Sequence, residues 1–209
     1  MSILNDIYNK AKKSHKTIVL PESSDPRILR SSEIILQSRL AKIILIGDEE
    51  NVKTRISHEG LSLSAVQIIS SRENDPLDFA ATMVARGEAD GMVAGSTYNS
   101  SAVIRCAIKI IGLAPGQKKL SSFMIMSLEN NTWGEQGVIF FADCAVIPNP
   151  NAEDLAEIAR QTANSFQSLT GREPRLALLS EVSLDEALNQ ANVLIFPDLD
   201  SANIGCKIT

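Results

Sequence analysis

Near its C-terminal end the chain reads Ala191-Asn192-Val193-Leu194-Ile195-Phe196-Pro197-Asp198-Leu199-Asp200-Ser201-Ala202-Asn203-Ile204-Gly205. A short apolar run ends at Pro197-Asp198, and a polar segment that contains a glycine follows it. Such a run, bounded by residues that break regular structure, is typical of a buried strand that delivers a loop to a cleft. We therefore expect a strand over 193–196, followed by a tight loop that Asn203 and Ile204-Gly205 shape.

Strands and helices alternate through the first half of the chain. Runs of β-branched and aliphatic residues predict strands over 17–20, 42–46, 65–69 and 91–94. Amphipathic spacing and capping residues predict helices over 3–11, 26–38, 49–58, 77–86 and 101–111. This alternation is typical of a parallel sheet that carries helices on both faces.

The second half of the chain has a different pattern. Two neighbouring strands, over 122–127 and 138–143, are joined by a polar turn, which predicts an antiparallel hairpin. After the hairpin we expect a helix capped by Asn151, followed by further strand and helix segments. The polar turn over 115–119 marks the change, so we expect one domain over 1–119 and another over 120–209. The expected fold class is α/β, with two domains of parallel-sheet, three-layer architecture.

The composition is that of a globular protein with aliphatic cores. Of 209 residues, 44% are hydrophobic, 22% are charged and only 4% are aromatic. The net charge is −5 and no basic stripe with interleaved aromatic residues is present, so we expect no nucleic-acid partner. No secretory leader and no run of membrane-spanning length are found, so we expect a cytoplasmic protein without membrane insertion.

Residues with metal-binding or nucleophilic side chains are few and dispersed. Cys106, Cys144 and Cys206 lie far apart in the sequence, and so do His15 and His58. Zinc sites place such residues at short fixed spacings, which this chain lacks. We therefore expect no metal and no disulfide framework, and we interpret the cysteines as small hydrophobic residues that fill space.

The loop over 95–101 is the strongest local candidate for a ligand site. Its small and hydroxyl-bearing residues allow backbone N–H groups to face a ligand, and the following helix N-terminus adds a partial positive charge. Arg105 lies four residues after Ser101, on the same helix face, where a guanidinium can hold a phosphate through two hydrogen bonds. The alternative is a capped helix whose Arg105 pairs with a surface carboxylate.

Three other polar segments are weaker candidates. Residues 21–27 also link a strand to a helix, and we interpret Arg27 there as structural. The pair Asp143-Cys144 has no histidine or arginine beside it in sequence, so we interpret the thiol as structural too. The polar residues after the strand over 193–196 are too few to predict a cation site: Asp198, Asp200 and Asn203.

Together these segments resemble the phosphate acetyl/butyryl transferase family, and within it the phosphate acetyltransferases. The matching segments follow the family's order across nearly the whole chain: Val19-Leu20-Pro21-Glu22, Gly87-Glu88-Ala89-Asp90-Gly91, 95–105, Phe141-Ala142-Asp143-Cys144, the helix after Pro150, 173–180 and 196–207.

The resemblance implies a fold, a reaction and a set of site residues. The family has two α/β domains with a cleft between them, in the isocitrate dehydrogenase-like fold. Its members move an acetyl group between coenzyme A and inorganic phosphate with no metal or cofactor, coenzyme A being a substrate. A homodimer is also implied. Arg105 is then the expected catalytic residue, and the expected substrate-binding residues are Ser96, Thr97, Asn99, Ser100, Ser101 and Asn203.

The chain also departs from the family pattern. The segment over 71–76 is short where the family has a longer helical segment, and Ser180 passes directly to Glu181 where the family continues at length. The family's C-terminal Leu-Ser-Arg-Gly motif and the aspartate thought to act as base have no counterpart, and Cys206 replaces a usual tyrosine.

We therefore expect an acetyltransferase from which two internal segments and the C-terminus are missing. The alternatives are a phosphate butyryltransferase, a transferase-like domain of a malic enzyme, and a non-catalytic remnant that binds coenzyme A.

Overall fold

A computed structural model describes residues 3–72, 74–179 and 182–208 of this chain. The chain divides into two compact units. The N-terminal unit is Tyr8–Gly112, and the C-terminal unit combines Met1–Ile7 with Leu113–Thr209. The boundary expected between residues 119 and 120 lies in the segment that joins the last helix of the N-terminal unit to the next strand.

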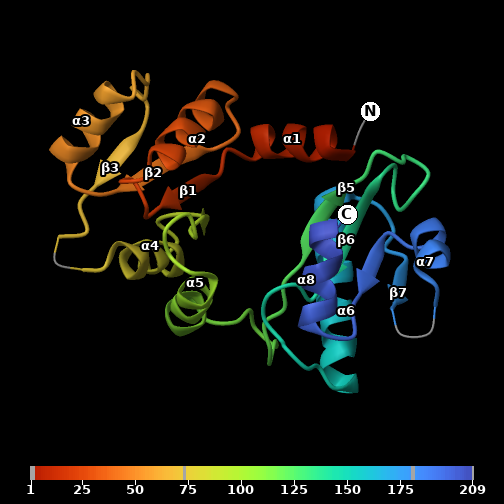
Figure 1. Ribbon diagram of the computed structural model, residues 1–209. Helices are drawn as coiled ribbons and strands as arrows, with labels where there is room; N and C mark the ends of the chain where they lie inside the picture. The colour runs from red at the N-terminus through yellow and green to blue at the C-terminus, as the bar shows by residue number, and fades with distance from the viewer. Residues whose placement is uncertain (1–2, 73, 180–181, 209) are drawn as a thin grey trace. The chain divides into compact units, whose positions relative to one another are not determined.

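The N-terminal unit contains a parallel sheet with the strand order β3-β2-β1-β4 (Figure 1). Its strands are β1 (Thr17–Leu20), β2 (Lys42–Ile46), β3 (Gln67–Ile69) and β4 (Gly91–Met92). Its helices are α2 (Pro26–Gln37), α3 (Glu49–His58), α4 (Pro76–Ala85) and α5 (Ser100–Cys106), with α1 (Ile3–Ser14) leading into β1 and the π-helical turn η1 (Ala107–Ile111) continuing α5. The predicted alternation of strands and helices is confirmed.

Helices cover both faces of this sheet because its central strands are apolar on both faces. Side chains alternate between the two faces along a strand. Leu20 and Leu45 pack with side chains of α2 and α3, whereas Val19 and Ile44 pack with those of α4. Each such buried side chain stabilises the fold by roughly 1.5–3 kcal/mol. The result is the expected three-layer arrangement.

Every helix that follows a strand in this unit begins at an aspartate or an asparagine. Asp25, Asp48, Asp75 and Asn99 cap α2, α3, α4 and α5, and each side chain accepts a hydrogen bond from a backbone N–H of the first turn. Such a cap is worth about 1 kcal/mol. Asp25 is therefore the N-cap of α2, directly before Pro26.

The C-terminal unit contains a second sheet with the strand order β5-β6-β8-β7. Its strands are β5 (Met124–Ser127), β6 (Val138–Ala142), β7 (Leu176–Leu178) and β8 (Val193–Ile195). Its helices are α6 (Ala152–Thr170), α7 (Leu184–Gln190) and α8 (Leu199–Ile208). β5 and β6 are antiparallel and the other pairs are parallel, which confirms the predicted hairpin.

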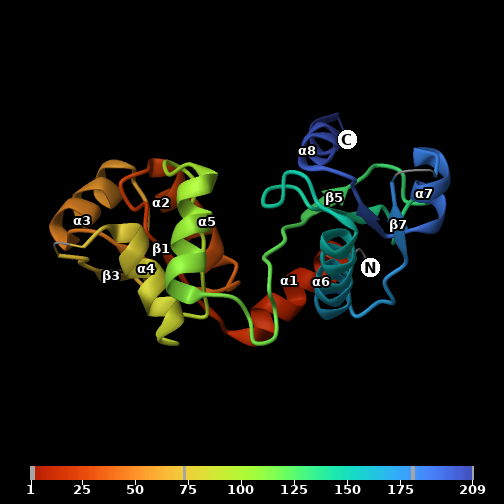
Figure 2. The ribbon, with the colours of Figure 1, turned by 90° about the horizontal axis from the view of Figure 1, so that it is seen from below.

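This sheet too is packed on both faces. Phe140 and Ile195 lie in a cluster with the α6 residues Ile158 and Phe166, which the N-terminal Ile3 joins. The opposite face packs against α7 and α8. Figure 2 shows α6 and α8 on opposite sides of the strands.

One prediction about the opening stretch is wrong. The segment after β8 is not a tight loop but the helix α8. The side chain of Asp198 accepts a hydrogen bond of 2.8 Å from the N–H of Ser201, as a capping aspartate does. Gly205 faces Phe196, and a Cβ atom at this position would lie 2.9 Å from that ring. The glycine thus permits close helix packing, and it does not mark a turn.

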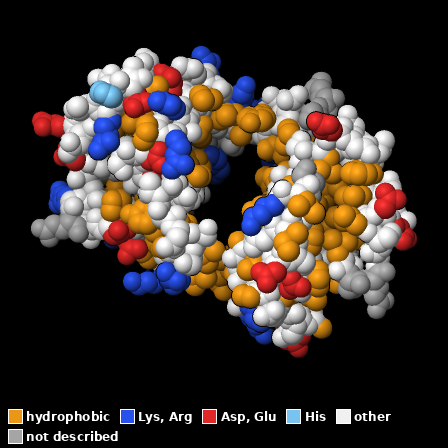
Figure 3. Space-filling model, viewed as in Figure 1, with side chains coloured by type: hydrophobic (Ala, Val, Ile, Leu, Met, Phe, Trp, Pro, Cys, Tyr) orange, Lys and Arg blue, Asp and Glu red, His pale blue; other side chains and the backbone are white. Residues whose placement is uncertain are grey.

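Several large hydrophobic side chains are exposed on the C-terminal unit, and Figure 3 shows hydrophobic side chains gathered over it. They lie on the edge strands β5 and β7 and on α7 and α8: Met124, Ile125, Leu176, Leu178, Leu184, Ile204 and Ile208. An apolar groove of about 690 Å³, lined in part by Trp133 and Phe196, belongs to the same unit. Among the described residues, no helix has both the length and the apolar character that a bilayer crossing requires.

Candidate functional site

The loops that follow β1 and β4 meet at one edge of the N-terminal sheet. β1 and β4 are neighbouring parallel strands, with Val19 opposite Met92. The carboxyl ends of parallel strands lie at the same edge, which is where α/β proteins bind ligands. The segments 21–27 and 95–101, both singled out in the sequence, are thereby brought into direct contact.

Glu22 holds the loop after β4 through its side chain. The carboxylate accepts hydrogen bonds from the backbone N–H groups of Gly95 at 2.8 Å, Ser96 at 2.9 Å and Tyr98 at 2.8 Å, and from that of Thr97. The hydroxyl of Thr97 donates another, at 2.7 Å. The sequence predicted that these amides face a ligand, whereas in the structure they converge on the protein's own carboxylate.

These hydrogen bonds determine the charge state of Glu22, of which only 3% is exposed. Burial by itself raises the pKa of a carboxyl group, because it penalises the charged form. The hydroxyl of Thr97 and the amides of Thr97, Tyr98 and Ser96 outweigh this effect and lower the pKa of Glu22 to about 2. Glu22 is therefore ionised at neutral pH and acts as a fixed internal counter-charge for the loop.

A second buried carboxylate ties the same loop to the start of α2. The guanidinium of Arg27 donates to Asp25 at 2.6 Å, and its Nη2 also donates to the carbonyl of Ser96 at 2.9 Å. The hydroxyl of Ser96 donates to Asp25 as well. The bonds from Arg27, and then that from Ser96, hold the pKa of Asp25 well below its usual range. The structural interpretation of Arg27 is therefore supported by its contacts.

The remaining loop residues lead into α5. Asn99 caps this helix by accepting from the N–H of Ala102 at 2.8 Å, and the hydroxyl of Ser101 donates to the same oxygen at 2.8 Å. Ser100 and Arg105 are exposed. Among the described residues, none forms a hydrogen bond or ion pair with the guanidinium of Arg105, so the alternative of a surface carboxylate partner has no support.

Apart from the capping Asn99, the predicted site residues of the N-terminal unit thus fall into two groups. The hydroxyl and backbone N–H groups of Ser96 and Thr97 donate hydrogen bonds to the buried carboxylates of Glu22 and Asp25. Ser100, Ser101 and Arg105 present side chains to solvent along the first turns of α5. That the residues of either group bind substrate stays a prediction. Arg105 is the best candidate of the second group, because no described residue pairs with its guanidinium.

Asn203 is the one predicted site residue that belongs to the C-terminal unit, whereas Arg105 and the loop over 95–101 belong to the N-terminal unit. It lies half-buried on α8 rather than in a loop. The expected contact of Asn203 with substrate stays a prediction.

Sequence reasoning missed the role of two acidic residues, Glu22 and Asp143. Asp143 is 3% exposed and accepts from the N–H groups of Ser122, Ala145, Val146 and Ile147 and from the hydroxyl of Ser122. Each of these acids stands at or just after the end of an apolar strand, where a charged residue needs partners. This position at the end of an apolar strand is the feature of the sequence from which their role could have been inferred.

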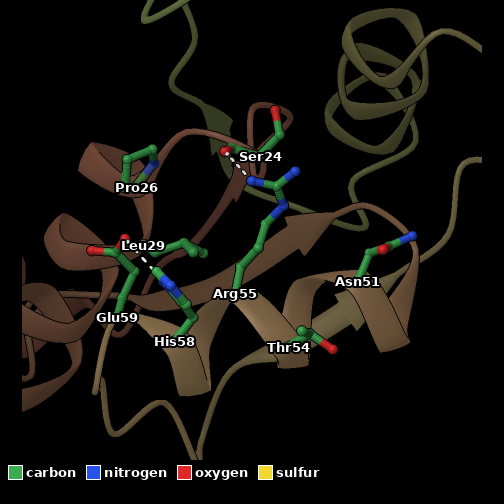
Figure 4. A pocket seen from close by; sticks show the side chains of 8 residues that line it. All are labelled: Ser24, Pro26, Leu29, Asn51, Thr54, Arg55, His58 and Glu59. Atoms are coloured by element: carbon green, nitrogen blue, oxygen red, sulfur yellow. Dashed lines mark hydrogen bonds and ion pairs between the residues drawn. The ribbon is translucent and has the colours of Figure 1, made fainter.

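A separate cavity of about 350 Å³ lies between α2 and α3 (Figure 4). Arg55 on its wall donates to the carbonyl of Ser24 at 3.3 Å, and Glu59 pairs with Arg30 at 2.7 Å. These charged groups are already partnered, which gives no reason to place a ligand here. In the part of the chain that the structure describes, no group of three or more His, Cys, Asp or Glu residues is arranged to hold a metal ion.

Known proteins resemble this chain over its whole length. The family model described as phosphate acetyl/butaryl transferase matches residues 2–77 and 70–189. A phosphate acetyltransferase of Thermoanaerobacterium thermosaccharolyticum is 34% identical, over 100% of this chain and 86% of the relative. The phosphate acetyltransferase of Acetivibrio thermocellus is 33% identical with the same coverage. A solved phosphotransacetylase from Streptococcus pyogenes aligns with a TM-score of 0.86 at 25% identity, over 100% of this chain and 86% of that one.

The relatives contain residues, within the aligned range, that this chain lacks. The alignment with the Thermoanaerobacterium protein extends over 285 residues, whereas this chain has 209. The family match is also broken into two stretches at residues 70–77, where the sequence predicts a shortened segment. The other predicted gap, between Ser180 and Glu181, lies outside the described residues.

Proposed function

The chain belongs to the phosphate acetyl/butaryl transferase family, and from this premise we propose that it transfers an acetyl group between coenzyme A and inorganic phosphate. The main support for this function is the match to phosphate acetyltransferases along 100% of the chain. The relatives named for acetyl transfer favour it over the butyryl alternative.

Positive groups near the acyl phosphate favour this reaction. The thiolate sulfur of coenzyme A attacks the carbonyl carbon of acetyl phosphate, an oxyanion forms, and its collapse expels phosphate. Negative charge develops on the carbonyl oxygen and on the leaving phosphate, so preorganised positive groups lower the barrier. The reverse reaction uses the same groups, with phosphate as the nucleophile.

Arg105 is our candidate for such a positive group. Its side chain is exposed on a short helix that begins at the loop after β4, and no described residue neutralises it. A guanidinium presents paired N–H groups that match two phosphate oxygens. Ser100 and Ser101, one turn earlier on the same helix, would add hydroxyl groups to the same anion.

The two buried carboxylates beside the loop are unsuitable as the base that takes the proton of the thiol. An effective general base has a pKa near the working pH. The pKa of Glu22 is lowered to about 2, and that of Asp25 is held below its usual range by Arg27. Both are also occupied by hydrogen bonds. Their contribution to the reaction is to position the loop that leads to Arg105.

Three finer properties belong to the same proposal. We propose that the enzyme needs no metal, that it is cytoplasmic, and that it forms a homodimer, as the resemblance to the family implies. Dialysis against a chelator should leave turnover unchanged, and light scattering of the eluted protein should give twice the mass of the chain.

The direct test is thiol-dependent turnover. Purified protein should convert acetyl phosphate and coenzyme A to the thioester, measured by its ultraviolet absorbance and by loss of free thiol. Arg105→Ala should lower kcat/KM by about 10²–10³-fold, the usual cost of removing one such charge-stabilising group. Arg86→Ala, another exposed arginine of the same unit, is the matched control and should have little effect. Equal activity of both variants would contradict the assignment of Arg105.

A non-catalytic remnant is the second candidate, and the difference between 285 aligned residues and 209 present residues favours it. It predicts binding of coenzyme A, seen by calorimetry, without turnover in the assay above. Turnover would rule it out.

A further inference from the structure

Two cysteines that are distant in the sequence meet in the C-terminal unit. Cys144 follows β6, and Cys206 lies on α8, 62 residues later. Their Sγ atoms are 3.5 Å apart and share a hydrogen bond, with both thiols free. The sequence predicted cysteines that only fill space. That interpretation would explain a single buried thiol, but it does not explain two thiols in contact.

The packing of α8 explains why the two sulfur atoms approach. Ala202 on this helix is fully buried, and Gly205 lets the helix lie against the ring of Phe196. Cys206 is the next residue, so its side chain is carried onto the end of β6. Cys144 is held in place there by its own N–H bond to the hydroxyl of Ser122 and is only 2% exposed.

We propose that Cys144 and Cys206 form a reversible intramolecular disulfide that fastens α8 to the end of β6. A disulfide has an S–S distance of about 2.0 Å, so closure requires the sulfur atoms to move together by a distance that side-chain rotation and a small helix shift supply. The oxidant is a low-molecular-weight disulfide such as oxidised glutathione.

The exchange proceeds in two balanced steps. The thiolate of the partly exposed Cys206 attacks one sulfur of the reagent and expels one reagent thiolate, which leaves a mixed disulfide on Cys206. Cys144 then loses its proton, its thiolate attacks the Cys206 sulfur, and the expelled second reagent thiolate takes up a proton. The protein loses two hydrogen atoms, and the reagent disulfide is reduced to two thiols.

The surroundings of Cys144 indicate which sulfur reacts first. Burial, and then the hydrogen bond with Cys206, raise the pKa of Cys144 well above that of a free thiol, so this thiol is protonated at neutral pH. Only thiolates attack disulfides. Cys206 is partly exposed and can be reached by a dissolved reagent, so it is the entry point. Cys144 acts as the resolving residue once the mixed disulfide has formed beside it.

The test counts thiols in the whole protein before and after incubation with oxidised glutathione. The wild type should lose two of its three thiols, with a loss of two hydrogen atoms from the intact mass and no retained glutathione. A digest under non-reducing conditions should contain one peptide pair, which joins Cys144 to Cys206. Cys106→Ser, which removes the third cysteine from the other unit, is the matched control and should still lose both remaining thiols.

Cys206→Ser should keep both of its thiols reduced, and Cys206→Ala serves if the serine variant does not fold. Oxidation should also raise the melting temperature of the C-terminal unit by roughly 5–10 °C, because the new bond closes a long loop. It should slow amide exchange in α8, and neither change should occur in the Cys206 variants. The proposal is overturned if the wild type keeps three thiols, stops at the mixed disulfide, or pairs Cys106.

Discussion

Glu22 in the N-terminal unit and Asp143 in the C-terminal unit are both buried carboxylates that hold a loop by accepting hydrogen bonds from its backbone. They differ in how far along the sequence their donors lie. Each is 3% exposed and stands at or just after the end of a central strand. Each accepts five hydrogen bonds, four of them from backbone N–H groups. The donors to Glu22 lie 73–76 residues away, whereas three donors to Asp143 lie only 2–4 residues away.

This difference distinguishes a tertiary clamp from a local one. Asp143 organises mainly its own turn, and it adds one distant residue, Ser122. Among the described residues, the side chain of Glu22 accepts only from the distant loop over 95–98, so it joins two loops that follow neighbouring strands. Loss of Glu22 should therefore disturb the loop that leads to Arg105, while loss of Asp143 should disturb the turn that holds Cys144.

The largest expected effect is that of Glu22→Ala. Four backbone N–H groups of the loop over 95–98 would lose their acceptor, and we expect the N-terminal unit to lose roughly 4 kcal/mol of unfolding free energy. Amide hydrogen exchange of peptides from each unit measures this separately. Glu50→Ala, which removes an exposed glutamate of the same unit, should change little. An unchanged exchange rate in the loop would show that the clamp is not needed.

The next prediction concerns pH. Glu22 has a pKa of about 2 in the folded chain against 4.5 for the free group, so its contribution is fully present above pH 4.5. It is lost as pH falls from 4.5 toward 2, and the total is roughly 3 kcal/mol. Because other carboxylates also titrate in this range, the measurement is the difference in unfolding free energy between wild type and Glu22→Gln. That difference should shrink on acidification, and a constant difference would contradict the assignment.

A smaller effect is expected for Asp143→Asn. An amide oxygen can still accept hydrogen bonds from the turn over 145–147, but the amide N–H₂ cannot, so some of the five bonds are lost. We expect the C-terminal unit to lose roughly 2 kcal/mol. The chain's single tryptophan, Trp133, lies in this unit and reports its unfolding by fluorescence. If Asp143→Asn lowered the unfolding free energy of its unit by more than Glu22→Ala lowers that of the N-terminal unit, the expected order of the two carboxylates would be wrong.

The smallest expected effect is that of Asn99→Ala, at the exit of the clamped loop. The cap of α5 would be lost at a cost of about 1 kcal/mol, while Glu22 would still hold the loop. Thermal unfolding should show a slight shift, and kcat/KM should fall less than in Arg105→Ala. A loss of activity as large as that of Arg105→Ala would mean that the cap positions the helix more tightly than the clamp does.

Much of the fold could be predicted from short stretches of sequence. The strand over 17–20, the helix starting at Pro26 and the hairpin after residue 120 depend on periodicity, capping and turn residues within a few positions of one another. The same local information located the loop over 95–101. It failed at Gly205, because a glycine required by a neighbouring ring looks the same in sequence as a glycine required by a turn.

What the chain alone determined, then, is where its strands and helices lie, α8 excepted, and which loops follow apolar strands. Only the tertiary structure decided that the loop amides bind Glu22, and that Cys144 meets Cys206. Both contacts span more than 60 residues and depend on which strands are neighbours in a sheet and on how a helix packs across it. Local propensities carry no information about such pairings, because the pairings arise from the burial of whole elements against one another.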